Sequence, residues 1–196
     1  MGNGATRLAL ELHGDGSTCA LWPHAFSFRL DVMVGKELRL DITAKNHGTT
    51  VAPFAFAFHT YFDVAEVAKC RTTGLENTVY IDKLDNLSRK TQHGDVSITG
   101  PTDRIYLDVP QHQTIIAPCG NTRIESDTHC AVVWNAWTND KNMPDLGEGN
   151  HVGYLCVERG EVADHTVQLV QGASIRRWMT LQHSDEQPRR IGSPLL

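Results

Sequence analysis

The stretch at residues 54–62, which reads FAFAFHTYF, alternates large and small side chains and leads into a histidine. Successive side chains of a β-strand point to opposite faces, so Phe54, Phe56 and Phe58 would share one face. The other face would carry two alanines and then His59, with open space beside the imidazole ring. This pattern fits a ligand-facing histidine. It also fits a core histidine bonded to a backbone carbonyl, and the stretch alone favours that second interpretation.

The same two-residue period runs through most of the chain, and no amphipathic helix longer than two turns is evident. Many short alternating segments at near-regular spacing predict an all-β sandwich of stacked sheets. We expect strands at residues 7–12, 26–34, 38–44, 50–62, 79–83, 96–99, 103–109, 114–117, 122–125, 130–137, 153–158, 162–170 and 174–182.

The clearest hairpin joins two alternating apolar runs in the first quarter of the chain. A three-residue loop at residues 35–37 sets Val34 opposite Leu38 and Val32 opposite Leu40, so apolar side chains face one another. A two-residue loop would instead set apolar residues opposite charged ones. Because a change of register moves side chains to the wrong partners or the wrong face, the sequence predicts the longer loop.

Length and charge exclude several classes of protein. The 196 residues suffice for one sizeable core, and we expect a single domain over residues 1–183 followed by a loose tail at 184–196. A net charge of -5 offers no basic surface for nucleic acid. No apolar run is long enough to span a membrane, and no signal-peptide pattern is present, so we expect a soluble, cytoplasmic protein. The polar segment 139–150 is expected to form a lid or rim.

The cysteines and histidines do not form a metal-binding pattern. The five cysteines are scattered without C-x-x-C spacing, and no H-x-H or H-x-x-x-H pair places two histidines on one face. We therefore expect free buried thiols in a reducing compartment and no bound metal. A nucleophile elbow of the G-x-S-x-G type and a phosphate-binding G-x-x-x-x-G-K loop are also absent from the sequence.

Three polar residues fall at or near the ends of predicted strands, namely His59, Asp103 and Glu158. Such positions can converge on one sheet, and a histidine with a glutamate is the minimal pair for delivering one proton and removing another. Spacing alone favours the alternative, in which the carboxylates lie separately on the surface and the histidine belongs to the core.

Motifs over residues 21–181 occur in a recognisable order: WPH at 22–24, HTYF at 59–62, GL at 74–75, YIDK at 80–83, TDRIY at 102–106, VVWNAW at 132–137 and CVE at 156–158. In this order they resemble the glucose-6-phosphate 1-epimerases. That family is also called the hexose-6-phosphate mutarotases or apospory-associated-protein-C-like proteins, and it lies within the galactose mutarotase superfamily. The resemblance implies a β-supersandwich, which agrees with the two-residue period.

The resemblance also implies a function. Members interconvert the α and β anomers of a hexose 6-phosphate without a metal or organic cofactor, so a sugar or sugar phosphate is the expected partner. Residue by residue, His59 matches the general acid, Glu158 the general base and Asp103 a residue that binds sugar hydroxyls. Each acid–base role needs a pKa near the working pH. With the resemblance, a site becomes the favoured interpretation of these three residues.

The sequence also departs from the family. The family motifs R-G-G-x-P-x-C-W-P-W-F-G and H-G-F-A-R, which supply phosphate-binding arginines and a second histidine, have no counterpart in residues 1–196. We therefore expect a sandwich without its N-terminal strands, and an open sheet edge that favours self-association. Two alternatives remain: a catalytically inactive sugar-binding or interaction module of the same fold, and a metal-dependent cupin-like isomerase.

Overall fold

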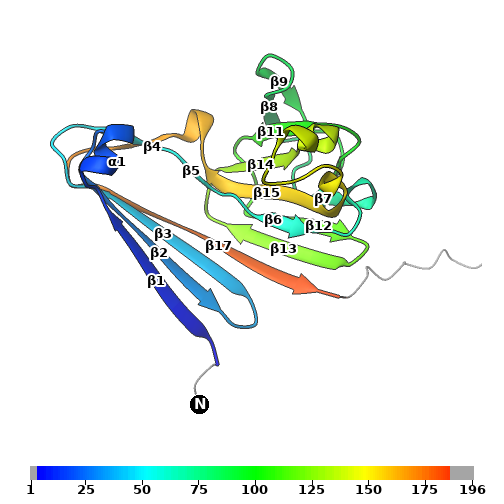
Figure 1. Ribbon diagram of the computed structural model, residues 1–196, viewed down its shortest axis with the longest axis horizontal. Helices are drawn as coiled ribbons and strands as arrows, with labels where there is room; N and C mark the ends of the chain where they lie inside the picture. Colours follow the sequence, from blue (N-terminus) through cyan, green and yellow to red (C-terminus); the bar gives the residue numbers. More distant parts are fainter. Residues whose placement is uncertain (1–3, 186–196) are drawn as a thin grey trace, which may run out of the picture.

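A computed structural model describes residues 4–185 as two large antiparallel β-sheets and one small one (Figure 1). The larger sheet has eight strands. In spatial order they are β1 (Thr6–His13), β2 (Phe26–Val34), β3 (Leu38–Asn46), β17 (Ser174–Ser184), β13 (Gly120–Ser126), β12 (His112–Ala117), β7 (Arg71–Thr73) and β10 (Val96–Ser97). The all-β prediction is confirmed.

The second sheet has seven strands, and it carries the histidine of the opening stretch at one edge. Its order is β5 (Phe56–Phe58), β15 (Tyr154–Glu161), β14 (Cys130–Asn135), β11 (Thr102–Tyr106), β8 (Val79–Asp82) and β9 (Ser88–Thr91), and β6 (Tyr61–Asp63) also pairs with β15. A small sheet pairs β16 (Val167–Leu169) with β4 (Ala52–Phe54).

The helices are short. They are α1 (Gly16–Leu21) and the 3₁₀ turns η1 (Val67–Lys69), η2 (Trp137–Asn142), η3 (Asn150–Gly153) and η4 (Ala163–His165). Within residues 4–185 no helix has the length and apolar character that crossing a membrane requires.

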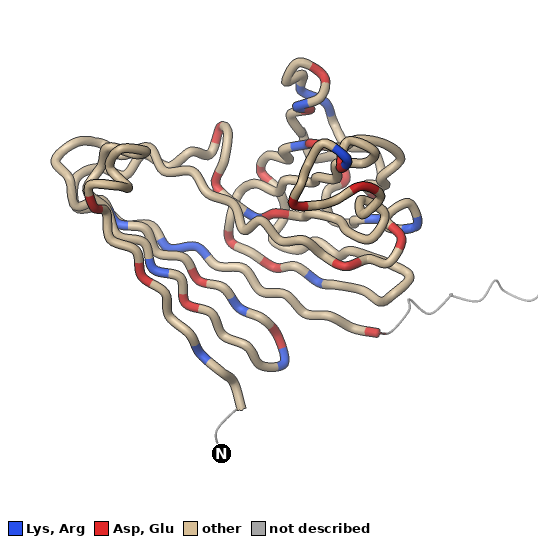
Figure 2. The backbone as a smooth tube through the Cα atoms, viewed as in Figure 1, with Lys and Arg blue, Asp and Glu red and all other residues tan. Residues whose placement is uncertain are grey.

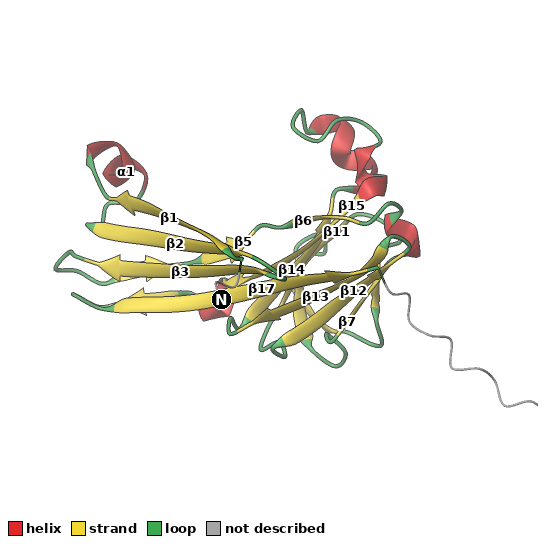
Figure 3. Cartoon of the chain, turned by 90° about the horizontal axis from the view of Figure 1, so that it is seen from below, coloured by secondary structure: helices red, strands yellow, loops and turns green. Residues whose placement is uncertain are grey.

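The main core lies where the two large sheets face each other. Ile115, Ile124 and Met179 come from the larger sheet, and Val133 and Val157 from the smaller one, all of them fully buried. The strands β1, β2 and β3 run out beyond the second sheet (Figures 1 and 3). We call these three strands the extension; they hold the N-terminal edge of the larger sheet away from the main core.

The first hairpin has the predicted register. β2 and β3 pair Val34 with Leu38 and Val32 with Leu40, so the three-residue loop is confirmed. The strands predicted at residues 114–117 and 122–125 also form a hairpin, between β12 and β13. There Ala117 faces Gly120, and the loop is two residues long.

The prediction of a single strand at residues 50–62 is wrong, because this segment is divided into β4, β5 and β6. β4 pairs with β16, whereas β5 and β6 pair with β15. β5 approaches β15 so closely that a Cβ atom at Gly160 would lie 2.2 Å from the carbonyl oxygen of Phe56, so only glycine fits there. The alternation itself holds, since the rings of Phe54, Phe56 and Phe58 contact one another in turn.

Other predicted strands are shorter or interrupted. The strand expected at 162–170 is replaced by η4 and then β16, with Ala163 in the left-handed region at φ 51°. The strand expected at 103–109 ends at Tyr106, two residues before another left-handed residue, Asp108. β7 and β9 were not predicted, because three- and four-residue strands are too short to show a period.

The remaining predictions on chain organisation have mixed outcomes. The segment expected as a lid or rim at 139–150 includes most of η2 and begins η3, so it is more ordered than a plain loop. Within the described residues all five cysteines are free, but two of them, Cys19 and Cys119, are exposed rather than buried. β17 continues to Ser184, and residues 186–196 of the expected tail lie outside the described residues.

Candidate active site

Strand pairing gathers the candidate residues on one face of the second sheet. Asp103 lies opposite Trp134, Trp134 opposite Cys156, and Cys156 opposite Tyr61. On the other side of Asp103, the Lys83 backbone N–H donates to the Asp103 carbonyl at 2.9 Å. These five residues form one row across the strands, so residues separated by up to 95 positions in the sequence become neighbours.

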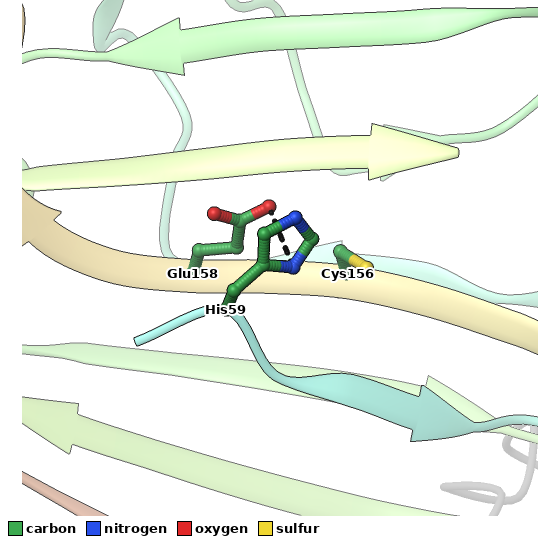
Figure 4. A group of neighbouring side chains, drawn as sticks. All are labelled: His59, Cys156 and Glu158. Carbon is green, nitrogen blue, oxygen red and sulfur yellow. Dashed lines mark ion pairs between the residues drawn. The ribbon is translucent and has the colours of Figure 1, made fainter. Parts of the chain in front are cut away.

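His59 and Glu158 lie together beside this row. Cys156 pairs with Tyr61 and Arg159 with Phe58, and this common register sets His59 opposite Glu158 even though the chain bends between β5 and β6. His59 Nδ1 is 3.3 Å from Glu158 Oε1 (Figure 4). The imidazole side chain is 53% exposed, whereas Glu158 is buried. One member of the pair, Glu158, is therefore buried in the sheet, and the other, His59, is open to solvent.

Burial gives Glu158 the properties of a base. Loss of hydration is the largest cause that raises its pKa, and the negative charge of Asp103 adds to it, while Lys83 acts in the opposite direction; the pKa of Glu158 is raised to about 7. A carboxylate with this pKa can accept a proton near neutral pH and release it again. Surface carboxylates with ordinary pKa values are much weaker bases.

Asp103 has one oxygen held and one oxygen unpaired. Lys83 Nζ lies 2.7 Å from Oδ2, while Oδ1 is buried without a hydrogen-bond partner. Because a buried acceptor without a partner costs free energy, such an atom calls for an explanation. A hydroxyl group of a bound ligand would satisfy it. Lys83 fixes the carboxylate in place through Oδ2 and leaves Oδ1 open.

Aromatic rings line the same face. His59 stacks on Tyr61, with ring centroids 4.9 Å apart and planes 5° apart, and Trp134 meets both rings edge-on at 6.1 Å. Tyr154 packs beneath Tyr61 and Trp134, at 5.3 and 5.7 Å. The stack orients the imidazole ring toward Glu158, and it offers apolar faces of the kind on which sugar C–H groups can pack.

His59, Cys156 and Glu158 also lie close enough to share one metal ion (Figure 4). Cys156 and Glu158 project from the same face of β15, two residues apart. Burial raises the pKa of the Cys156 thiol, which disfavours the thiolate that a metal ligand requires. The donor set therefore fits proton transfer between His59 and Glu158 better than it fits a metal centre.

Sequence reasoning missed several members of the site. Lys83, Trp134 and Cys156 all lie within the motifs that carried the resemblance, but they had no assigned role. Lys83 becomes meaningful only through its contact with Asp103 across two strands. The three predicted site residues, His59, Asp103 and Glu158, are all brought to the same sheet face.

The fold, an open antiparallel sandwich that carries a histidine–glutamate pair on the face of one sheet, is of the galactose mutarotase-like class. A family model described as "Aldose 1-epimerase" matches residues 3–182, and the chain is a member of that family. The resemblance drawn from the motifs is thereby confirmed.

Two sets of relatives agree with this membership. Proteins named "Putative glucose-6-phosphate 1-epimerase" from Cenchrus ciliaris and Escherichia coli are 36% and 29% identical to the chain, over 72% and 77% of its length. A Salmonella typhimurium structure described as "a putative mutarotase (YeaD)" superimposes with a TM-score of 0.83 at 23% identity, and the Slr1438 protein from Synechocystis with 0.76 at 21%.

The chain is shorter than these proteins. It spans 46% and 51% of the two curated relatives, and the superpositions cover 92% of this chain but 61% and 62% of the two solved structures. Because the two solved structures are only 23% and 21% identical to the chain, the likeness to them shows the fold alone.

Glu158→Gln should stabilise the fold at alkaline pH. The pKa of Glu158 is about 7 in the folded state against an ordinary value of 4.5, so between these values the folded state retains a proton that the unfolded state has lost. Wild-type stability should fall as pH rises through this window, whereas the amide carries no such penalty. Urea unfolding should show a gain on the order of 2 kcal/mol at pH 8 and none near pH 4. An equal gain at both pH values would contradict this.

Proposed function

We propose that this chain interconverts the α and β anomers of an aldose, and that its substrate is a hexose 6-phosphate such as glucose 6-phosphate. The observation that carries this proposal is the buried Glu158 carboxylate, with a pKa of about 7, next to the exposed imidazole of His59 at 3.3 Å. Mutarotation requires one group to take a proton and another to give one, and these two side chains suit those roles.

In the proposed reaction, Glu158 takes the proton from the hydroxyl group on C1 of the sugar. The electron pair of that O–H bond forms the carbonyl as the bond between C1 and the ring oxygen breaks. Protonated His59 delivers a proton to the ring oxygen, and Nε2 is the natural donor because Nδ1 faces Glu158. The sugar opens to a free aldehyde, and no oxidant or reductant is required.

The second half reverses these steps on the other face of the aldehyde. Rotation about the bond between C1 and C2 exchanges the carbonyl faces, His59 recovers the proton of the attacking hydroxyl, and Glu158 returns its proton to the oxygen on C1. Asp103 Oδ1 accepts a hydrogen bond from another sugar hydroxyl, which holds the rest of the substrate still while C1 turns. The sugar ring packs on Trp134 and Tyr61.

The names of the relatives support the choice of a 6-phosphorylated substrate. The described residues of this site include one cation beside the carboxylates, Lys83, and its ammonium is engaged by Asp103 at 2.7 Å. The assay should therefore compare glucose 6-phosphate with glucose directly.

NMR exchange spectroscopy between the two anomers tests the proposal. Wild-type protein should accelerate exchange of glucose 6-phosphate over the buffer rate, and the double variant His59→Ala/Glu158→Gln should not. If the wild type and the double variant exchange anomers equally, the proposal is wrong. Calorimetric binding of glucose 6-phosphate without exchange would establish the alternative, an inactive sugar-binding module of the same fold.

Removal of metal ions should leave the activity unchanged. Proton transfer between His59 and Glu158 needs no Lewis acid, and the protonated Cys156 thiol is a poor ligand. We expect the same anomer exchange rate before and after dialysis against EDTA, with metal content checked by elemental analysis. Loss of activity on dialysis that is restored by added Zn²⁺ would favour the metal-dependent isomerase.

A further inference from the structure

β1 is a long and regular strand at the open end of the larger sheet. Among residues 4–185 it pairs with β2 alone, and all eight of its residues are exposed. It contains no proline and no bulge, which are two of the features that commonly protect a free edge, and its charged residues include both Arg7 and Glu11. On its inner face Leu8, Leu10 and Leu12 are each about half exposed, at 54%, 51% and 48%. Such an edge is suited to pairing with another strand.

The hydrogen-bond pattern shows which backbone groups of β1 are open. Just beyond the strand, the Gly14 N–H donates to the Phe26 carbonyl at 2.9 Å. Because hydrogen-bonded pairs alternate along an antiparallel ladder, the even-numbered residues of β1 turn their N–H and C=O groups toward β2. The odd-numbered residues, Arg7, Ala9, Glu11 and His13, turn theirs to the open edge.

We propose that two copies of this chain pair through their β1 strands, antiparallel about a two-fold axis at Ala9. The two copies of Ala9 then face each other as a hydrogen-bonded pair, and Arg7 of each copy faces the partner's Glu11. These three pairs use open backbone groups of both strands. They also place two opposite-charge contacts on the outer face. On the inner face Leu8 lies opposite the partner's Leu10, which continues the apolar surface from one copy to the next.

Charge selects this register over its neighbours. An axis at Leu8 or Leu10 would face Ala9 with Arg7 or with Glu11, so these opposite charges would not meet. An axis at Arg7 or Glu11 would set like charges directly opposite each other, which is destabilising. Glu11 is also held in position on the outer face, because Arg29 Nη1 contacts its Oε1 at 2.5 Å and His13 Nε2 lies 3.7 Å from its Oε2. The Glu11 and His13 side chains are both exposed, so the carboxylate is accessible to the partner's Arg7. Figure 2 shows charges of both signs along the extension.

Charge reversal followed by mixing tests the register. The variants Arg7→Glu and Glu11→Arg, each alone, set like charges opposite each other at both contacts. We expect each dimer to dissociate about tenfold or more readily than wild type in sedimentation equilibrium. An equimolar mixture of the two variants restores opposite charges at both contacts, so a heterodimer at least as stable as the wild-type dimer should form. The mixture is informative even if one variant alone is less stable.

The matched control makes the same charge changes away from the edge. Lys36 and Glu37 lie in the exposed turn between β2 and β3, and Lys36→Glu, Glu37→Lys and their mixture should dimerise as the wild type does. A wild-type chain that stays monomeric at all concentrations would overturn the proposal. So would a dimer whose stability does not respond to Arg7→Glu and Glu11→Arg.

Hydrogen exchange gives an independent readout along the strand. The amides of Arg7, Ala9 and Glu11 should exchange rapidly in dilute protein and slow down as the concentration rises. The amides of Leu8 and Leu10 already bond to β2 and should change little. Concentration-dependent protection that lacks this alternation would place the interface elsewhere and overturn the proposed pairing.

Discussion

The Glu158→Gln variant should interconvert the anomers of glucose 6-phosphate at least about a hundredfold more slowly than the wild type. The amide keeps the shape of the carboxylate but cannot accept a proton from the hydroxyl group on C1. Binding should weaken far less, since Asp103 Oδ1 and the aromatic residues remain. NMR exchange at saturating substrate measures the rate, and Glu37→Gln, in the exposed turn of the first hairpin, is the matched control with unchanged activity.

The pH dependence of the wild type should identify the same group. With a Glu158 pKa of about 7, the carboxylate is ionised above neutrality and protonated below it. The exchange rate should therefore fall as pH decreases through 7, and the residual rate of Glu158→Gln should lack this inflection. Retention of wild-type activity and of the inflection in Glu158→Gln would show that another residue is the base.

Replacing Arg159 by methionine should destabilise the fold by about 3 kcal/mol or more. Arg159 neighbours Glu158 on β15 but points into the core, where it is fully buried and the loss of hydration lowers its pKa to about 10. Its guanidinium donates to the Thr128 hydroxyl at 3.1 Å, to the Thr128 and Pro110 carbonyls at 2.5 and 2.9 Å, and to Gln113 Oε1. Methionine would remove the guanidinium donor from the Thr128 carbonyl and from Gln113 Oε1, whereas the Pro110 carbonyl would still accept from Gln113 Nε2 at 2.6 Å.

Urea unfolding should also distinguish the guanidinium from a simple positive charge. Arg159→Lys keeps the charge but has three donors on one atom, which cannot reach acceptors arranged around a planar fork, so it should lose much of the same free energy. The exposed Arg123→Met on β13 serves as control and should change stability by less than about 0.5 kcal/mol. If Arg159→Lys were as stable as the wild type, charge rather than geometry would be the important property.

The parts of the fold that local pattern controls were predictable. The first hairpin appeared with its loop length and register, because one face of each strand is apolar and only one register lets those faces match. His59, Asp103 and Glu158 were named as one site, but the residue pattern alone favoured a core histidine and separate surface carboxylates. The order of the HTYF, TDRIY and CVE motifs changed that interpretation.

The parts that depend on distant partners were not predictable. Nothing in FAFAFHTYF shows that its first residue, Phe54, pairs with β16 and its later residues with β15, and that division creates the bend at His59. An arginine within an apolar strand pattern does not reveal the four acceptors that Arg159 meets in the core. The predicted strands at 103–109 and 162–170 are interrupted near Asp108 and Ala163, which have left-handed backbone conformations. A two-residue period does not predict such conformations.

By itself the sequence determined an all-β chain, the register of its first hairpin and the candidate residues for proton transfer, because these depend on side-chain alternation and on motif order. Only the tertiary structure decided the surroundings of those residues. Burial between paired strands raises the pKa of Glu158, and Lys83 reaches Asp103 across a strand pair. Hydration and cross-strand contact are properties of the assembled sheet, and they cannot be read from the linear sequence.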